Sequence, residues 1–151
     1  MMPGDPVCSI IVFCDYVIVE QTTGKNSLIG TFGNLGSLQF PFVIPSFFVH
    51  VNITNFIPGS AAISLAVNLK HVQTGGVVGS VAFPIQLPSL KAKLPPGGAQ
   101  INLNVPLQNV NFPAPGAYEC EVLFDGERIG SRILEVTQHK PSSFTPPQNL
   151  S

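Results

Sequence analysis

The residues of this chain that are able to do acid–base or metal chemistry are few and widely separated. The three histidines, His50, His71 and His139, have no metal-ligand spacing. None of the eight carboxylates lies between residues 21 and 118; they are Asp5, Asp15, Glu20, Glu119, Glu121, Asp125, Glu127 and Glu135. Catalysis requires titratable groups gathered in one site. The sequence therefore predicts that the protein is not an enzyme and uses no metal or cofactor, with a small hydrolase or metalloenzyme as the weakest alternative.

Asp15 is the most conspicuous charged residue, because it lies inside the apolar run 7–19. An unpaired carboxylate buried in a strand is costly. One interpretation is a ligand or partner site. The other, which we favour, is a structural carboxylate that accepts backbone N–H bonds or meets an arginine such as Arg128 or Arg132, since buried carboxylates usually have such partners.

The elements that must position these residues are short strands. Fourteen glycines and 15 prolines punctuate apolar runs, which is typical of an all-β sandwich or barrel. We expect about eight strands, and a long connection over 33–45 that resembles a Greek-key crossover. The expected organisation is an N-terminal extension (1–8), a sandwich (9–137) and a Pro-rich C-terminal tail (138–151). The strands are expected at 9–20, 27–32, 46–55, 62–71, 77–87, 100–105, 117–124 and 127–136.

Two stretches of the chain carry a resemblance. Tyr118-Glu119-Cys120 follows a Pro-Gly turn and looks like the tyrosine corner of immunoglobulin-like (Ig-like) sandwiches. The opening stretch, with Cys14-Asp15-Tyr16-Val17, Gly24-Lys25 and Leu28-Ile29-Gly30-Thr31-Phe32, is similar to the start of a small family of uncharacterised bacterial Ig-like domains. The resemblance covers roughly residues 9 to 137. It implies an Ig-like antiparallel β-sandwich with Greek-key connections, and it implies no activity.

The resemblance also assigns structural roles. Tyr118 would form the corner, and Cys14 would be a partner for Cys120 only if the first strand lay opposite the seventh across the core. The chain departs from antibody-type domains because it contains no tryptophan.

The number of cysteines and the N-terminal residues indicate the cellular compartment in which we expect the protein. Three cysteines are too few for a disulfide scaffold, and an odd number leaves at least one thiol unpaired. The residues before the apolar run 7–19 are acidic rather than basic, and the run itself is too short to span a bilayer. We therefore expect reduced thiols, no signal peptide, no membrane insertion, and a protein that is cytoplasmic or part of a particle assembled in the cytoplasm.

Charge is unusually sparse. Of 151 residues, 44% are hydrophobic and only 10% are charged, against roughly 25% charged in a typical soluble domain. The net charge of −1 gives no electrostatic basis for binding nucleic acid or an anionic membrane. From Asn26 to Tyr118 the charged residues are Lys70, Lys91 and Lys93.

Interface cores are depleted in charge and enriched in aromatic residues. The candidate interface residues, which we expect at loop positions, are Phe42, Phe47, Phe48, Phe56 and Ile57. The alternative is that these side chains simply cap the ends of the sandwich.

Our first hypothesis is a non-catalytic structural or adaptor subunit that acts through protein–protein contacts in a homo-oligomer or larger particle. The second is a ligand-binding module, for a glycan or peptide, that uses the end loops of the sandwich.

Overall fold

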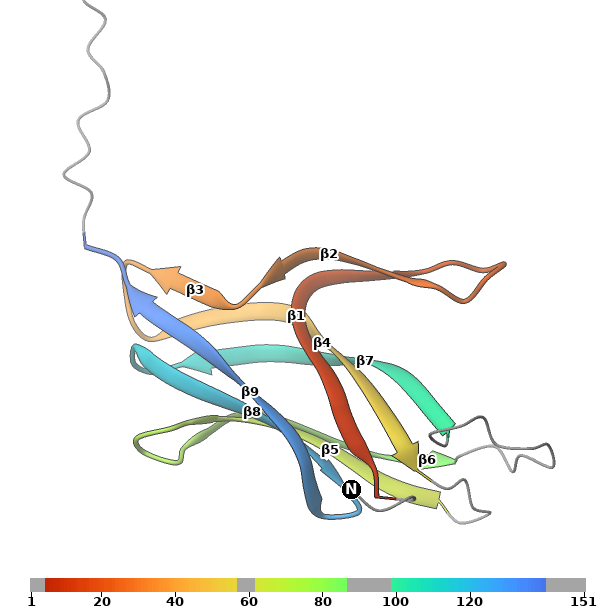
Figure 1. Ribbon diagram of the computed structural model, residues 1–151. Helices are drawn as coiled ribbons and strands as arrows, with labels where there is room; N and C mark the ends of the chain where they lie inside the picture. Colours follow the sequence, from red (N-terminus) through yellow and green to blue (C-terminus); the bar gives the residue numbers. More distant parts are fainter. Residues whose placement is uncertain (1–4, 57–61, 87–98, 141–151) are drawn as a thin grey trace, which may run out of the picture.

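Nine strands make up the described part of the chain, residues 5–56, 62–86 and 99–140 of a computed structural model (Figure 1). These residues contain no helix, and therefore none long and apolar enough to cross a membrane. The strands are β1 (Val7–Val19), β2 (Asn26–Phe32), β3 (Asn34–Ser37), β4 (Phe42–Phe56), β5 (Ala62–His71), β6 (Val77–Gln86), β7 (Ala99–Phe112), β8 (Gly116–Phe124) and β9 (Glu127–Gln138).

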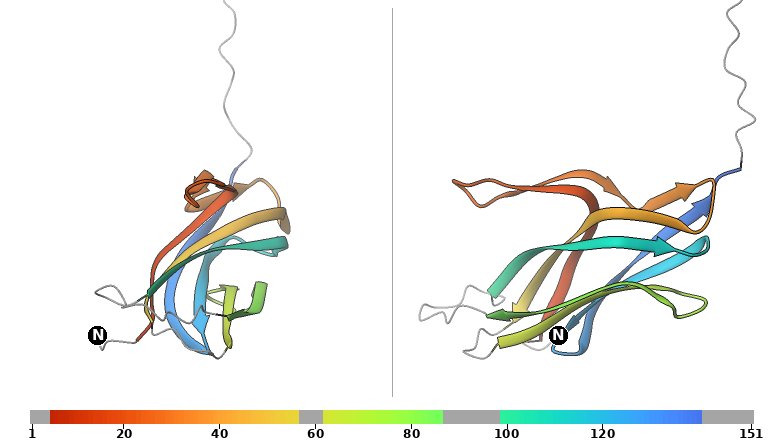
Figure 2. Two further views of the ribbon diagram at one scale, coloured as in Figure 1. Left: turned by 90° about the vertical axis from the view of Figure 1, so that its right-hand side faces the viewer. Right: turned by 180° about the vertical axis from the view of Figure 1, so that it is seen from behind.

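The strands form two sheets packed face to face (Figure 2). The first sheet has the order β2-β1-β4-β7 and the second the order β3-β9-β8-β5-β6, so the chain crosses between sheets in Greek-key fashion. The expected all-β sandwich is confirmed, with nine strands rather than eight. The additional strand is β3, in the segment 33–45 that the sequence analysis treated as a connection. Its four residues include Gly36 and are too short to show an alternating pattern.

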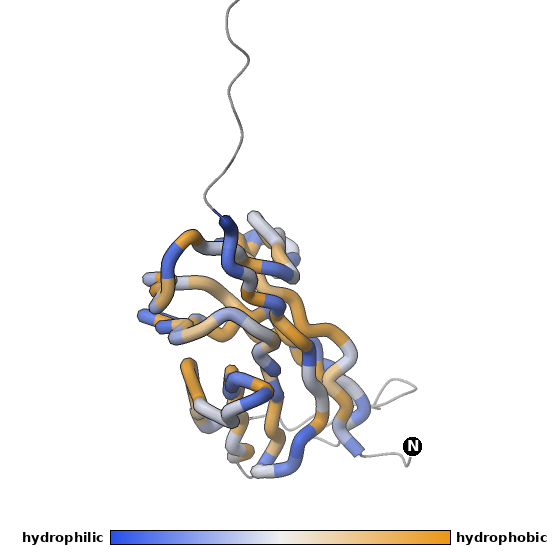
Figure 3. The backbone as a smooth tube through the Cα atoms, turned by 90° about the vertical axis from the view of Figure 1, so that its left-hand side faces the viewer, coloured by the Kyte–Doolittle hydropathy of each residue, from blue (hydrophilic) through white to orange (hydrophobic). Residues whose placement is uncertain are grey.

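Alternate residues of each strand fill the space between the sheets, and apolar and polar stretches succeed one another along the backbone (Figure 3). Full burial of one such Val, Leu or Phe side chain stabilises the fold by about 1.5–3 kcal/mol. From the first sheet the core takes Ile11, Phe13, Phe47, Val49, Val51, Ile53, Val105, Leu107, Val110 and Phe112; from the second it takes Leu65, Val67, Leu69, Tyr118, Cys120, Val122, Leu134 and Val136.

β1 changes its partner halfway along its length. From Val7 to Cys14 it pairs with β4, and from Phe13 to Val19 it pairs with β2. Beyond Cys14 the ribbon of β1 and β2 leaves the body of the sandwich and projects as a two-stranded hairpin (Figure 1), which we call the arm (residues 15–31). The apolar run predicted as one covered strand is therefore interior only in its first half.

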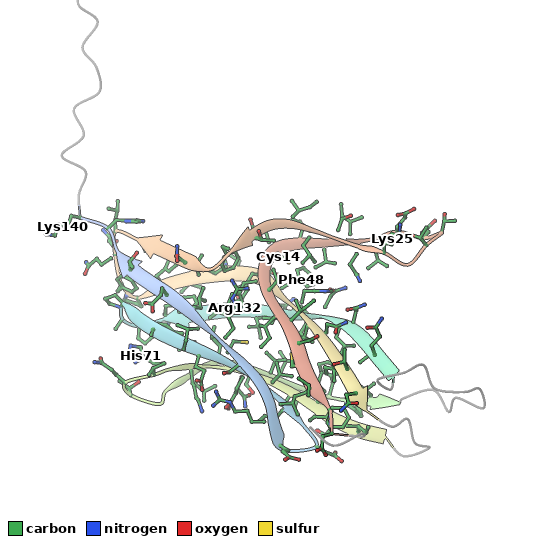
Figure 4. The ribbon with its side chains drawn as sticks, viewed as in Figure 1. Cys14, Lys25, Phe48, His71, Arg132 and Lys140 are labelled. Carbon is green, nitrogen blue, oxygen red and sulfur yellow. The ribbon has the colours of Figure 1, made fainter. Side chains whose placement is uncertain are left out.

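Arg132 joins the two sheets near the point where β1 changes partner. Its Nη1 donates a 2.6 Å hydrogen bond to the carbonyl oxygen of Ile11, and its guanidinium carbon lies 5.5 Å from the centre of the Phe13 ring. Arg132 lies on β9 in the second sheet, whereas Ile11 and Phe13 lie on β1 in the first (Figure 4). A cation above an aromatic face is attracted by the ring quadrupole, so both contacts hold β1 against β9.

β3 is the exception to antiparallel pairing. It runs parallel to β9, with Asn34 opposite Glu135 and Ser37 opposite Gln138. Directly after β9, the backbone N–H of His139 donates to the carbonyl oxygen of Ser37 at 2.9 Å. The last strand therefore holds β3 along its whole length.

Replacing Arg132 by alanine should lower the free energy of unfolding by about 1.5 kcal/mol, because a charge-assisted hydrogen bond between the sheets is lost. Arg128 on the same strand is the matched control. It pairs with Glu119 on the surface, so Arg128→Ala should cost about 0–1 kcal/mol. Urea denaturation of both variants tests the difference, and equal losses would contradict a sheet-joining role for Arg132.

Candidate functional site: the uncharged sheet face and its arm

The outward faces of the two sheets differ in charge. On the second sheet, Lys70 Nζ lies 3.2 Å from Glu121 Oε2, and the two guanidinium nitrogens of Arg128 lie 2.9 and 3.1 Å from the carboxylate oxygens of Glu119. β4 and β7, two neighbouring strands of the first sheet, contain no Asp, Glu, Lys or Arg. The outward side of these two strands, which we call the uncharged face, therefore carries no ionic group.

Polar side chains on this uncharged face form a hydrogen-bond chain that begins on β1. The hydroxyl of Ser9 donates to Asn52 Oδ1 at 2.7 Å, and Asn52 Nδ2 donates to Asn102 Oδ1 at 2.6 Å. Asn52 and Asn102 lie opposite each other on β4 and β7. Asn52 is only 8% exposed, and this chain satisfies its amide.

A second hydrogen-bond chain ties the arm to the sheet. His50 Nδ1 lies 2.7 Å from Asn104 Oδ1, and Asn104 Nδ2 donates to Asn26 Oδ1 at 3.0 Å. An amide oxygen only accepts, so Nδ1 of His50 carries the proton. Asn26 begins β2, and its contact with β7 holds the turn of the arm over the outward face.

The turn of the arm and the sheet enclose an open cleft of about 460 Å³. Its lining comes from the turn (Thr23, Gly24, Lys25 and Asn26), from β4 (His50) and from β7 (Asn102). Lys25 lies near the tip of the arm (Figure 4).

The aromatic candidates from the sequence lie on β4, not in loops. Phe47 is fully buried and meets the rings of Phe13 and Phe32 edge-on, so its assignment to an interface is wrong: it belongs to the core. Phe42 is partly buried and stacks on Phe112 at 5.9 Å, and Phe48 is partly buried. The side chain of Phe56 and the whole of Ile57 lie outside the described residues.

Asp15 is exposed, at the root of the arm. Its carboxylate lies against Gly30, which has a positive φ of 70° and no side chain to obstruct the approach. The two arginines considered as partners are engaged elsewhere, Arg128 with Glu119 and Arg132 with Ile11. The expectation of a buried carboxylate paired with an arginine is therefore wrong, because β1 has already left the sandwich at this residue.

All three cysteines are free thiols. Cys120 belongs to the core cluster and Cys14 is buried outside it, and no disulfide joins them. Burial raises the pKa of Cys120 to about 12 and that of Cys8 to about 11. Burial, with the neighbouring Asp15 carboxylate, also raises the pKa of Cys14. Thiols held protonated in this way are poor nucleophiles.

Tyr118 has the geometry of a tyrosine corner. Its side chain is fully buried, and its hydroxyl donates a 2.5 Å hydrogen bond to the carbonyl oxygen of Ala114. Burial raises the pKa of this hydroxyl, although the bond to Ala114 opposes the shift.

The histidines lie in separate parts of the fold. His50 belongs to the uncharged face, His139 packs against Gly36, and His71, the last residue of β5, is 5% exposed. Nδ1 of His71 accepts the backbone N–H groups of Gln73 and Thr74 at 3.2 and 3.3 Å. Within the described ranges, no three His, Cys, Asp or Glu residues are grouped as metal ligands would be.

Sequence reasoning missed the arm and its cleft. Tyr16 is 66% exposed, Ile18 54% and Ile29 47%, although each sits in a run that reads as core. The one sequence feature that could have revealed the arm was Asp15, a charged residue at the position where β1 ceases to be buried.

The architecture is that of an Ig-like β-sandwich. The chain belongs to a family of unknown function, DUF6941, whose model matches residues 9–137. No curated protein matches the chain in sequence.

Solved structures resemble this chain at low identity and with TM-scores below 0.5. An immunoglobulin-like protein from Pseudomonas aeruginosa is 10% identical with a TM-score of 0.39, over 89% of this chain and 98% of that one. An alkylpurine DNA glycosylase, AlkC, from Pseudomonas fluorescens, bound to DNA with an abasic site analog, is 15% identical with a TM-score of 0.49, over 88% of this chain. This chain spans only 30% of the glycosylase. Likenesses at this level carry no conclusion about this chain.

Tyr118→Phe should lower the free energy of unfolding by about 1–3 kcal/mol, because the Ala114 carbonyl loses its buried partner. Tyr16→Phe is the control with the same chemistry at an exposed position, and it should leave stability unchanged. Urea denaturation at neutral pH compares the two. Loss of stability in both variants to the same extent would contradict the corner's role.

Stability should fall as the pH rises above 9. An unfolded thiol ionises near 9.0, whereas the buried Cys120 keeps its proton to about 12. The unfolded chain therefore releases protons first between these values, and unfolding becomes easier across that window. Urea titrations at pH 8 and pH 10.5 should show a smaller loss in Cys120→Ala than in the unaltered protein, and identical losses would count against this cause.

Proposed function

We propose that this protein is a non-catalytic structural or adaptor subunit that docks onto a second copy of itself through the arm. The observation that carries the proposal is the arm's exposed apolar surface. Tyr16 lies opposite Ile29 in the β1–β2 register, and Ile18 lies two residues further along the same face. Isolated two-stranded ribbons are marginally stable in water, so a ribbon with an apolar outward face gains stability when that face is covered.

The edge of the arm supports a self-complementary contact. β2 is the terminal strand of its sheet, and it contains no charged residue. Proteins that remain monomeric usually protect such edges with charges or proline. Two copies of an uncharged edge can pair antiparallel about a two-fold axis, which is the commonest symmetry of homo-oligomers.

The distribution of charge indicates which side of the molecule would be buried on docking. The second sheet presents the ion pairs of Lys70, Glu119, Glu121 and Arg128, as a solvated face does. Docking through the outward face of the arm instead removes few charges from water. A place in a particle assembled in the cytoplasm is consistent with this arrangement.

Light scattering tests the proposal. At micromolar concentration the protein should have about twice its 16.0 kDa chain mass or more. Ile29→Lys places a charge on the edge strand and should return the mass to that of the monomer. Val72→Lys is the control, because Val72 is 54% exposed but lies outside the arm; this variant should keep the wild-type mass.

Two outcomes would overturn the proposal. One is a monomer at every concentration tested. The other is an Ile29→Lys variant that assembles like the unaltered protein.

A further inference from the structure

The geometry points to a binding site for a small hydroxylated carboxylate, such as a sugar acid, in the cleft beneath the arm. The inference is independent of docking, because it uses the opposite face of the ribbon. Asn26, which lines the cleft, faces the sheet, whereas Ile29, three residues along the same strand, lies on the outward face.

The first hydrogen-bond chain ends at the cleft with a donor. Asn52 Nδ2 donates to Asn102 Oδ1, which fixes the orientation of the Asn102 amide. Its Nδ2, which has no partner among the described residues, is therefore the atom left to meet a ligand. An amide nitrogen only donates, so a ligand group that contacts this wall of the cleft must be a hydrogen-bond acceptor.

The second hydrogen-bond chain ends in the same way from the opposite wall. Asn104 donates to Asn26 Oδ1, so the Asn26 amide also has its Nδ2 left to donate, with no partner recorded within the described ranges. Two hydrogen-bond chains that start on different strands thus direct N–H groups into one cleft. Oriented amides of this kind favour a ligand rich in lone pairs.

Charge selects an anion among such ligands. Lys25 lines the cleft and carries an ammonium group, and none of the described lining residues is acidic. A carboxylate accepts from amide N–H groups and from an ammonium at the same time, and charge-assisted hydrogen bonds are roughly twice as strong as neutral ones.

His50 adds a requirement for a hydroxyl group. Its Nδ1–H is committed to Asn104, so in the neutral ring Nε2 is an acceptor. Among the described residues, every side-chain nitrogen or oxygen that is inaccessible to solvent has a hydrogen-bond partner. Nε2 of His50 has no hydrogen-bond partner there, so it must be accessible to solvent. This atom is therefore open to the cleft that His50 lines, where it can accept from a ligand hydroxyl.

The size of the cleft agrees with a single sugar ring. Its volume of about 460 Å³ lies within the range of roughly 300–1,000 Å³ common for small-molecule sites. The cleft is open and no aromatic residue lines its described wall, so we expect weak binding, with a Kd of about 1 mM.

Titration of the full-length protein with D-galacturonate, followed by NMR, tests the site. The side-chain amide signals of Asn26 and Asn102 should shift and saturate. Galactose is the matched ligand, because it has the same ring and hydroxyls without the carboxylate, and acetate supplies the carboxylate without the ring. Galactose should bind up to about fivefold more weakly, the factor expected for losing one exposed charge contact. Acetate should also bind more weakly, because it has no hydroxyl groups to meet His50.

Two matched lysine variants test whether Lys25 supplies the positive charge that binds the carboxylate. Lys25→Gln should weaken galacturonate binding by about fivefold, whereas Lys140→Gln, which removes the same charge at the far end of the molecule (Figure 4), should not. Equal binding of galacturonate and galactose, equal effects of the two variants, or saturable shifts confined to residues outside the cleft would overturn the assignment. Absence of any shift at 20-fold the expected Kd, about 20 mM, would overturn it as well.

Discussion

After Cys14, β1 loses its pairing with β4 and continues only beside β2. Much of the structure depends on this change of partner. The first half of the strand needs a support on its free side, and the Arg132 side chain of the opposite sheet supplies one at Ile11 and Phe13. The second half becomes an arm whose inner face is tied to the sheet by the hydrogen bond from Asn104 to Asn26. Its outer face exposes Tyr16 and Ile29 to solvent.

The uncharged face shows how a sheet can remain polar without ions. Asparagine both donates and accepts, so a row of amides satisfies itself only if every member points the same way. On this face one row begins at the Ser9 hydroxyl, which donates to Asn52, and a separate row begins at the Nδ1–H of His50, which donates to Asn104. The orientation that gives these amides their hydrogen bonds also determines which amide atoms remain free to bind a ligand. Ionic pairs on the second sheet need no such common direction.

Local chemistry made parts of this fold predictable. Asp125-Gly126 forms the β8–β9 hairpin turn with φ values of 53° and 84°, as a primed turn requires, and the spacing of Tyr118 and Cys120 marked the corner. The arm was not predictable, because hydropathy reports preference for burial and not whether a neighbouring sheet exists to provide it; residues 15–19 read as core for this reason. Phe47 was assigned to an interface because it follows the connection 33–45, although its alternation with Val49 and Val51 places it on the inward face of β4. The cleft depends on amides brought together from β2, β4 and β7, which no single stretch of sequence displays.

The parallel pairing of β3 with β9 has a consequence for biosynthesis. A nascent chain emerges from the ribosome from its N-terminus, so β1, β2 and β4 are free to assemble early, while β3 must wait for the final strand. The same strand brings Arg132, so the anchorage of β1 is also completed last. Until then the growing polypeptide exposes an unpaired strand edge and an unsupported ribbon, which are features that holding chaperones recognise and that favour aggregation. Translation that stops before residue 127 would leave a product in that state, and the cell's proteases would have ready access to it.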